Sequence, residues 1–184
     1  ADALKALLAQ LRTFVSTGVR VDLVISNYVY EHVEDGKRHV VDYRRVLPVG
    51  KVFGWDEIRH FKKSQYLLMH ALTYRVDTLR EANLTMPAHT FYVDNIYAYV
   101  PFPHCKSLYY LDVDLYRYFI GREDQSVNEK VQISRLDQQM RVTNVMVDAV
   151  KLPEGAGNRK LAAYMANYLG LIVAQGVYVF HFGV

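Results

Sequence analysis

Residues 107–118 alternate between two kinds of side chain, which severely limits how this segment can fold. Leu111, Val113 and Leu115 fall on one face. The other face carries three tyrosines and two aspartates: Tyr110, Asp112, Asp114, Tyr116 and Tyr118. A period of two residues is that of an extended chain. The segment is therefore predicted to be a β-strand with an apolar and a polar face.

A second alternating run covers residues 21–33, VDLVISNYVYEHV. Asp35-Gly36 follows it, and then KRHVVDYRRV. Two extended runs that flank an Asp-Gly pair are typical of a β-hairpin. Residues 65–76 are predicted to form a buried strand.

Helices are predicted at both ends of the chain. Apolar residues at helical spacing mark the first, with Gly18 as its stop: Leu4, Leu7, Leu8, Leu11, Phe14 and Val15. Shorter helices are expected from Trp55 and over 77–83. Ser126 and Glu129 form a capping box for a helix that runs to about Leu152, and a last helix covers about 158–175. These elements predict one α/β domain, more narrowly α+β, with a small mixed sheet and a helix-rich C-terminal part.

Composition limits the class of protein. A hydrophobic fraction of 51% and a charged fraction of 22% are typical of soluble globular proteins. No apolar run approaches the roughly 20 residues of a membrane span. The single cysteine, Cys105, rules out an internal disulfide and fits a reducing compartment, so a cytoplasmic location is expected. The basic residues do not interleave with aromatics as in a nucleic-acid platform, so no nucleic-acid partner is expected.

The net charge of +3 is mild, but four basic residues stand in two pairs, Arg44-Arg45 and Lys62-Lys63. They could favour a phosphate-bearing ligand or an anionic membrane surface. The other interpretation is a solvated face.

Residues 89–126 hold ten of the 24 aromatic side chains, in under a quarter of the chain. Aromatic side chains mixed with acids and arginines suit a site that grips a hydroxyl-rich ligand and moves a proton on it. Asp94 lies between Phe91-Tyr92-Val93 and an apolar run. It has two interpretations: the N-cap of a helix, or a general base held near a reacting hydroxyl.

Asp112-Val113-Asp114 matches the short DxD pattern with which many nucleotide-sugar enzymes hold a divalent cation. Because both acids lie mid-strand among tyrosines, an exposed or hydrogen-bonded strand face is the favoured interpretation. A metal-dependent hydrolase built on these acids and His104 is a further alternative. The seven histidines show no metal-ligand spacing, and no metal site is predicted.

Arg117, Arg122, Gln125 and Ser126 surround the approach to the capped helix. Free N–H groups at the helix start and two guanidinium groups would suit a phosphate or diphosphate. The alternative is that Ser126 only caps the helix and the arginines are only solvated.

The segments HTFYVDNIYAYVPFP and SLYYLDVDLYRYFIGREDQSVNEK resemble family 2 glycosyltransferases of bacterial polysaccharide and glycolipid synthesis. VDLVISNYVYE and SQYLLMHALTYR extend the resemblance over roughly residues 1–152. It implies a partial GT-A fold: residues 1–152 match the C-terminal, acceptor-side portion, and 153–184 form a helical extension. The family's Gln-x-x-Arg-Trp motif of processive synthases is missing.

The resemblance also implies roles. Asp94 matches the general base of inverting members, although Val93-Asp94 keeps only the second acid of their Glu-Asp pair. Tyr92, Arg117, Arg122, Gln125 and Ser126 are the implied substrate-binding residues.

The family's nucleotide-binding half and its DxD motif would precede residue 1. A Mg²⁺ or Mn²⁺ ion is therefore expected in the full-length enzyme and not on this portion, which should be inactive alone. The expected partners are a nucleotide-sugar donor and a saccharide or lipid-linked acceptor. The resemblance also implies a location at the inner face of the membrane, with peripheral membrane association. Self-association through an exposed face is expected as well. The alternative function is a non-catalytic oligomerisation or scaffold module.

Overall fold

The computed structural model describes residues 2–33, 35–62, 65–120 and 129–182. The helices are α1 (Asp2–Thr17), α2 (Val76–Glu81), α3 (Val93–Tyr99), α4 (Glu129–Ser134), α5 (Leu136–Ala149) and α6 (Arg159–Phe182). The strands are β1 (Leu23–His32), β2 (Arg38–Val41), β3 (Val52–Phe53), β4 (Leu72–Tyr74) and β5 (Leu108–Ile120). Short 3₁₀ turns lie at Trp55–Glu57, Met69–Ala71, Phe102–His104 and Glu154–Ala156. The prediction of a mixed α/β domain with a small mixed sheet is confirmed.

The sheet is built around one parallel pair. β1 runs parallel to β5, whereas β2 and β4 pair antiparallel with β1, and β3 pairs antiparallel with β5. The order is β2-β1-β5-β3, with β4 paired to the start of β1. The predicted hairpin is confirmed: β1 and β2 pair across a turn in which Gly36 adopts the left-handed conformation, φ 66°.

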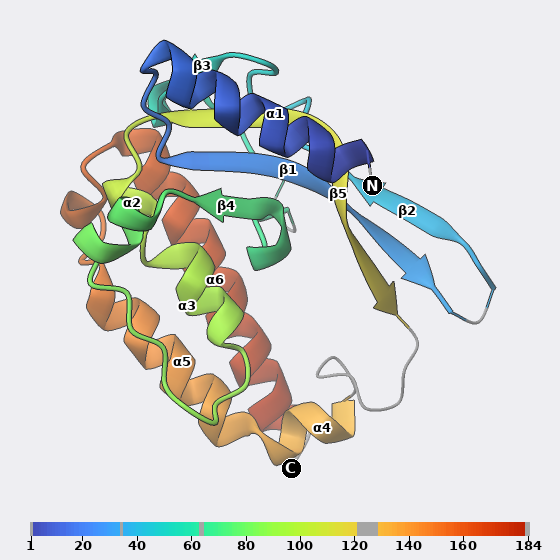
Figure 1. Ribbon diagram of the computed structural model, residues 1–184. Coiled ribbons are helices and arrows are strands. Elements are labelled where there is room, and N and C mark those ends of the chain that lie inside the picture. The colour runs from blue at the N-terminus through green and yellow to red at the C-terminus, as the bar shows by residue number, and fades with distance from the viewer. Residues whose placement is uncertain (1, 34, 63–64, 121–128, 183–184) are drawn as a thin grey trace.

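Helices cover both faces of the parallel pair (Figure 1). α1 lies on one face, where Leu7 and Phe14 pack on Val24 of β1 and Tyr109 of β5. The other face carries the main core, to which α3, α5 and α6 contribute. β1 is consequently buried almost throughout and does not show one wet and one dry face.

A β-bulge displaces β5 relative to β1. The register moves from Ser26↔Leu111 to Asn27↔Asp114 and then to Tyr28↔Tyr116. Asn27 is fully buried at this point, and its side chain fills the break. Its amide nitrogen donates to Asp112 Oδ1 at 2.8 Å, and its oxygen accepts from the Tyr110 hydroxyl at 2.6 Å. These bonds satisfy a buried polar side chain that would otherwise be costly.

Asp22 fastens the start of the parallel pair. Its side chain is only 2% exposed. Oδ2 accepts the backbone N–H groups of Lys106 at 2.9 Å and Ser107 at 3.0 Å, and Oδ1 pairs with Arg20 at 2.9 Å. Burial acts to raise the pKa of Asp22, but these bonds outweigh it and the pKa is lowered. The carboxylate therefore joins β1 to the segment that enters β5.

Two predicted elements are wrong in extent. Residues 65–76 do not form one strand: of this segment, Leu72–Tyr74 alone is a strand of the sheet, after a 3₁₀ turn. The backbone before this strand is hydrogen-bonded outside the sheet: the N–H of Leu67 donates to the Tyr164 hydroxyl of α6 at 2.9 Å. The predicted helix to Leu152 is two helices, α4 and α5, which meet at a non-helical Arg135.

α6 is longer than predicted and belongs to the same core as the sheet. Its first half buries Leu161, Tyr164, Met165 and Tyr168 in the main core. Its second half exposes Val177 and other apolar side chains. By length and composition, Arg159–His181 could cross a membrane, with 28% of the apolar stretch buried in the domain.

Replacing Asp22 by Ala should destabilise the domain by about 2–4 kcal/mol, because several hydrogen bonds to a buried carboxylate are lost. Urea denaturation would measure the loss. Glu81→Ala is the matched control, because Glu81 also binds Arg20 but is exposed. It should cost under about 1 kcal/mol. Equal losses in the two variants would contradict the role of Asp22.

Candidate functional site

A cavity of about 610 Å³ opens on the core side of the sheet, beside α3 and α6. β1 and β5 supply three tyrosines to its wall, and the segment before β4 supplies another aromatic pair. Asp94 of α3 is the carboxylate in the lining. The aromatic and imidazole side chains in the lining are Tyr30, Tyr66, His70, Phe91, Tyr92, Tyr116 and Tyr118.

The tyrosines of the two strands gather because the strands are parallel and in register. After the bulge, Tyr28 lies opposite Tyr116, and Tyr30 opposite Tyr118. The rings of Tyr30 and Tyr118 meet edge to face with centroids 5.8 Å apart. This geometry is favourable for aromatic pairs, and it places a row of tyrosines at the cavity.

Asp94 lies in the first turn of α3, after a sharp change of backbone direction. The N-cap position is taken by Tyr92, whose φ of 66° lies in the left-handed region. The interpretation of Asp94 as the N-cap is therefore wrong. Contacts fix this turn from two sides: Asn95 Oδ1 accepts from the Tyr168 hydroxyl at 3.1 Å, and Phe91 N–H donates to Gln138 at 2.8 Å.

The surroundings of Asp94 make its carboxylate more basic. Burial raises its pKa, and bonds from the backbone N–H groups of Asp94 and Asn95 act in the opposite direction without cancelling the effect. Among the described lining residues there is no Lys or Arg to stabilise the charge. A carboxylate in this environment is suited to take a proton.

His70 contributes a neutral wall to the same cavity. Its ring packs against Tyr28, Tyr116 and Tyr118, with centroids 4.2–5.3 Å away. Burial lowers the pKa of His70 to about 4. Near neutral pH it therefore adds no positive charge beside Asp94.

The other residues predicted for substrate binding do not all lie at the Asp94 cavity. Tyr92 lines the cavity with Asp94. Arg117 lies between Tyr116 and Tyr118 on β5, on the opposite face, and pairs with Glu31 of β1. Arg122, Gln125 and Ser126 lie outside the described residues. Their binding roles stay predictions.

The interpretation of Asp112 and Asp114 as a hydrogen-bonded strand face is confirmed. Asn27 donates to both, at 2.8 and 3.2 Å, and Arg44 Nε donates to Asp112 Oδ2 at 2.6 Å. Within the described ranges, no group of three or more His, Cys, Asp or Glu side chains could hold a metal ion.

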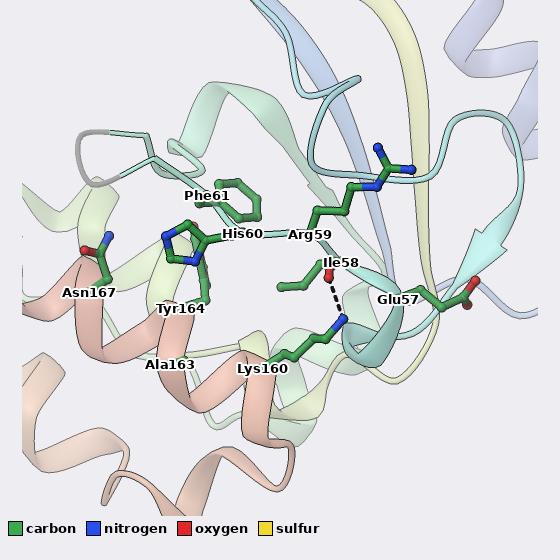
Figure 2. Close-up of a pocket in the computed structure, with 9 residues that line it drawn as sticks. All are labelled: Glu57, Ile58, Arg59, His60, Phe61, Lys160, Ala163, Tyr164 and Asn167. Carbon is green, nitrogen blue, oxygen red and sulfur yellow. Dashed lines mark hydrogen bonds between the residues drawn. The ribbon is translucent and has the colours of Figure 1, made fainter.

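A second cavity, of about 420 Å³, lies where residues 57–61 cross α6 (Figure 2). Lys160 donates to the carbonyl oxygen of Ile58 at 2.8 Å, and Glu57 and Arg59 extend away from α6. Its floor is formed by Phe61 and Tyr164, which belong to the core. Lys160 is therefore engaged with the backbone, and Glu57 and Arg59 point away from α6, so this cavity is a weaker candidate for a catalytic site than that of Asp94.

Sequence reasoning missed Tyr30, Tyr66 and His70 as residues of the site. Tyr30 and Tyr118 each stood out in an alternating run, but nothing in either run showed that the two strands pair. No local pattern distinguishes Tyr66 or His70, because a buried strand over 65–76 would place them in the core and not at a site.

Comparison of the sequence with family models found no match, and no curated protein matches it.

Asp94→Asn should raise the unfolding temperature at about pH 7. Because the folded-state pKa is raised, ionisation of Asp94 costs more in the folded than in the unfolded protein. That cost is absent below the ordinary carboxyl pKa of about 4 and grows as pH rises through the folded-state value. The gain in unfolding temperature should therefore shrink toward about pH 4, which calorimetry across pH would measure.

Asp112→Asn is the matched control, because the bond from Arg44 lowers the pKa of Asp112. Its effect should have the opposite sign, a lower unfolding temperature near neutrality. A destabilised Asp94→Asn at neutral pH would contradict the assignment of Asp94 as a buried, uncompensated charge.

Proposed function

We propose that this chain is the acceptor-binding and catalytic-base portion of an inverting glycosyltransferase with a GT-A-type fold. It would serve transfer of a sugar from a nucleotide-sugar donor to a saccharide or lipid-linked acceptor, in the cytoplasm at the inner face of the membrane. The observation that carries the proposal is the buried carboxylate of Asp94 in an aromatic cavity. The same residue was singled out by the resemblance to family 2 glycosyltransferases.

The side chains that line the cavity support a saccharide ligand. A sugar ring has C–H groups on its two faces and hydroxyls around its edge. Tyrosine rings offer flat apolar faces for the former and phenol hydroxyls for the latter. Tyr30, Tyr66, Tyr92, Tyr116 and Tyr118 supply both around Asp94.

Asp94 would act on the acceptor hydroxyl. As that oxygen attacks the anomeric carbon of the donor, the bond from the carbon to the departing nucleoside diphosphate breaks. The hydroxyl proton passes to the Asp94 carboxylate. Attack opposite the leaving group inverts the configuration at the carbon. The raised pKa of Asp94 improves the match between base and hydroxyl.

The donor would be held mainly by groups other than the described ones. The resemblance assigns the nucleotide, and the Mg²⁺ or Mn²⁺ ion that binds its diphosphate, to a preceding half of the enzyme. The described residues of this chain provide the opposite wall of the active site.

Asp94→Asn should reduce transfer by about 10²–10⁴-fold in a chain that includes the donor-binding half, because the amide cannot accept the proton. Donor binding should be retained. Product formation from a radiolabelled nucleotide-sugar would measure the loss. Asp114→Asn is the control: it lies on β5, is exposed, and should keep transfer near the wild-type rate. Undiminished transfer by Asp94→Asn would exclude Asp94 as the base.

The second candidate, a non-catalytic oligomerisation module, has an observation of its own. A groove of about 290 Å³ between α5 and α6 is lined largely by apolar side chains. Met140, Val177 and Phe180 are more than half exposed there. An apolar surface of this kind favours a contact between copies of the chain.

If that contact forms, the average mass from light scattering should rise with concentration toward that of a dimer. Val177→Asp should return it to the monomer mass. Val15→Asp, at an exposed position of α1, is the control and should leave the dimer intact. A monomer at all concentrations would eliminate the self-association candidate.

A further inference from the structure

A third cavity continues the site of Asp94 toward the edge of the sheet. It has a volume of about 610 Å³, and Tyr30, Tyr66 and Leu68 line both it and the Asp94 cavity. The two cavities are therefore adjacent. A ligand longer than one sugar ring could lie in both.

This third cavity is basic, unlike the cavity of Asp94. Arg45 and Lys62 line it, together with the imidazoles of His39 and His60. Asp42 is the acidic side chain among its lining residues. We refer to it as the basic cavity.

The two cations are held together by the fold although they come from different segments. The N–H of Arg59 donates to the carbonyl of Val46 at 2.8 Å, and the Gln65 side chain donates to the carbonyl of Asp42 at 3.3 Å. These bonds dock the segment that carries Lys62 beside the one that carries Arg45. The cluster is a product of tertiary structure, since 17 positions separate the two in the sequence.

Neither cation is neutralised within the described part of the chain. Other basic residues of these segments are neutralised: Arg44 pairs with Asp112 at 2.6 Å, and Lys51 pairs with Glu57 at 2.6 Å. Arg45 and Lys62 form no ion pair with a described residue. The carboxylate of Asp42 is engaged locally, where Oδ1 accepts the N–H of Arg44 at 3.1 Å. Two cations that form no ion pair, against the one carboxylate of Asp42 among the described lining residues, favour an oxyanion.

We propose that the basic cavity binds an oxyanion carried by the acceptor saccharide, a carboxylate or a phosphate on a sugar unit next to the one that reacts. The inference rests on the proposed function, because it takes the reacting unit to lie at Asp94. It narrows the acceptor to anionic saccharides. Arg45 and Lys62 would position the acceptor and take no part in proton transfer.

The test compares two ligands that differ only in charge: a disaccharide that ends in glucuronic acid, and the same disaccharide ending in glucose. Titration calorimetry on this chain at low salt should show the acidic disaccharide binding about tenfold or more tightly. The gain should fall as salt is added. Inorganic phosphate alone, as a third ligand, should compete with the acidic disaccharide and not with the neutral one.

The variants locate the effect. Arg45→Gln with Lys62→Gln should remove the preference for the acidic disaccharide and leave the neutral one unchanged. Asp42→Asn, which keeps the oxygen that accepts from Arg44, should strengthen the preference. Arg59→Gln is the control, because Arg59 is a nearby cation outside the basic cavity. Circular dichroism and the unfolding temperature would confirm that each variant is folded.

Equal binding of the two disaccharides by the wild-type chain would overturn the inference, as would failure of both to bind. So would a preference that persists in the double variant. If anionic phospholipid vesicles bind the chain through Arg45 and Lys62 while the disaccharides do not discriminate, the cations face a membrane and the inference is again wrong. Failure of the proposed function is read separately, from undiminished transfer by Asp94→Asn.

Discussion

The parallel pairing of β1 with β5 is the interaction on which the remaining structure depends. It brings together strands that are 85 residues apart at their aligned starts, Leu23 and Leu108. Because helices cover both faces, β1 is buried almost throughout, and a polar side chain within it is costly unless it is hydrogen-bonded. Asp22 and Asn27 form such bonds, one at the start of the pair and one at the bulge. They are buried polar residues with a structural function.

The same pairing places the candidate site. The bulge sets which residues of β5 lie opposite Tyr28 and Tyr30, and so gathers the tyrosines on the core side. α3 then brings Asp94 to that side, held by contacts from α5 and α6. Burial of a carboxylate among aromatic side chains raises its pKa, which links packing to chemistry. The site is therefore a consequence of how several distant segments pack, and a small change in register would disperse it.

The charge distribution over the Asp94 cavity and the basic cavity follows from the same packing. Most described arginines near the sheet edge are paired with acids, as Arg44 is with Asp112 and Arg38 with Glu31. Arg45 and Lys62 are left without such a partner, and they lie beyond the tyrosine wall from Asp94. Asp94, the proposed base, is thereby kept apart from cations that would lower its pKa. An anionic ligand can still be held within reach.

The sequence by itself determined the local elements: α1, β1, the hairpin at Gly36, most of β5 and α6 follow from periodicity and turn chemistry. It also singled out Asp94, and it identified Asp112 and Asp114 as acids of a strand face. Only the tertiary structure decided the rest. Residues 65–76 lost their predicted strand because Leu67 bonds to Tyr164 of α6, and Arg135 interrupts a long helix where its guanidinium lies over Phe91. Contacts between remote segments brought Tyr30, Tyr66 and His70 to the site, and placed Arg45 and Lys62 in the lining of one cavity. The physical reason is that periodicity reports which face of an element is buried, whereas long-range hydrogen bonds and packing decide against what it is buried.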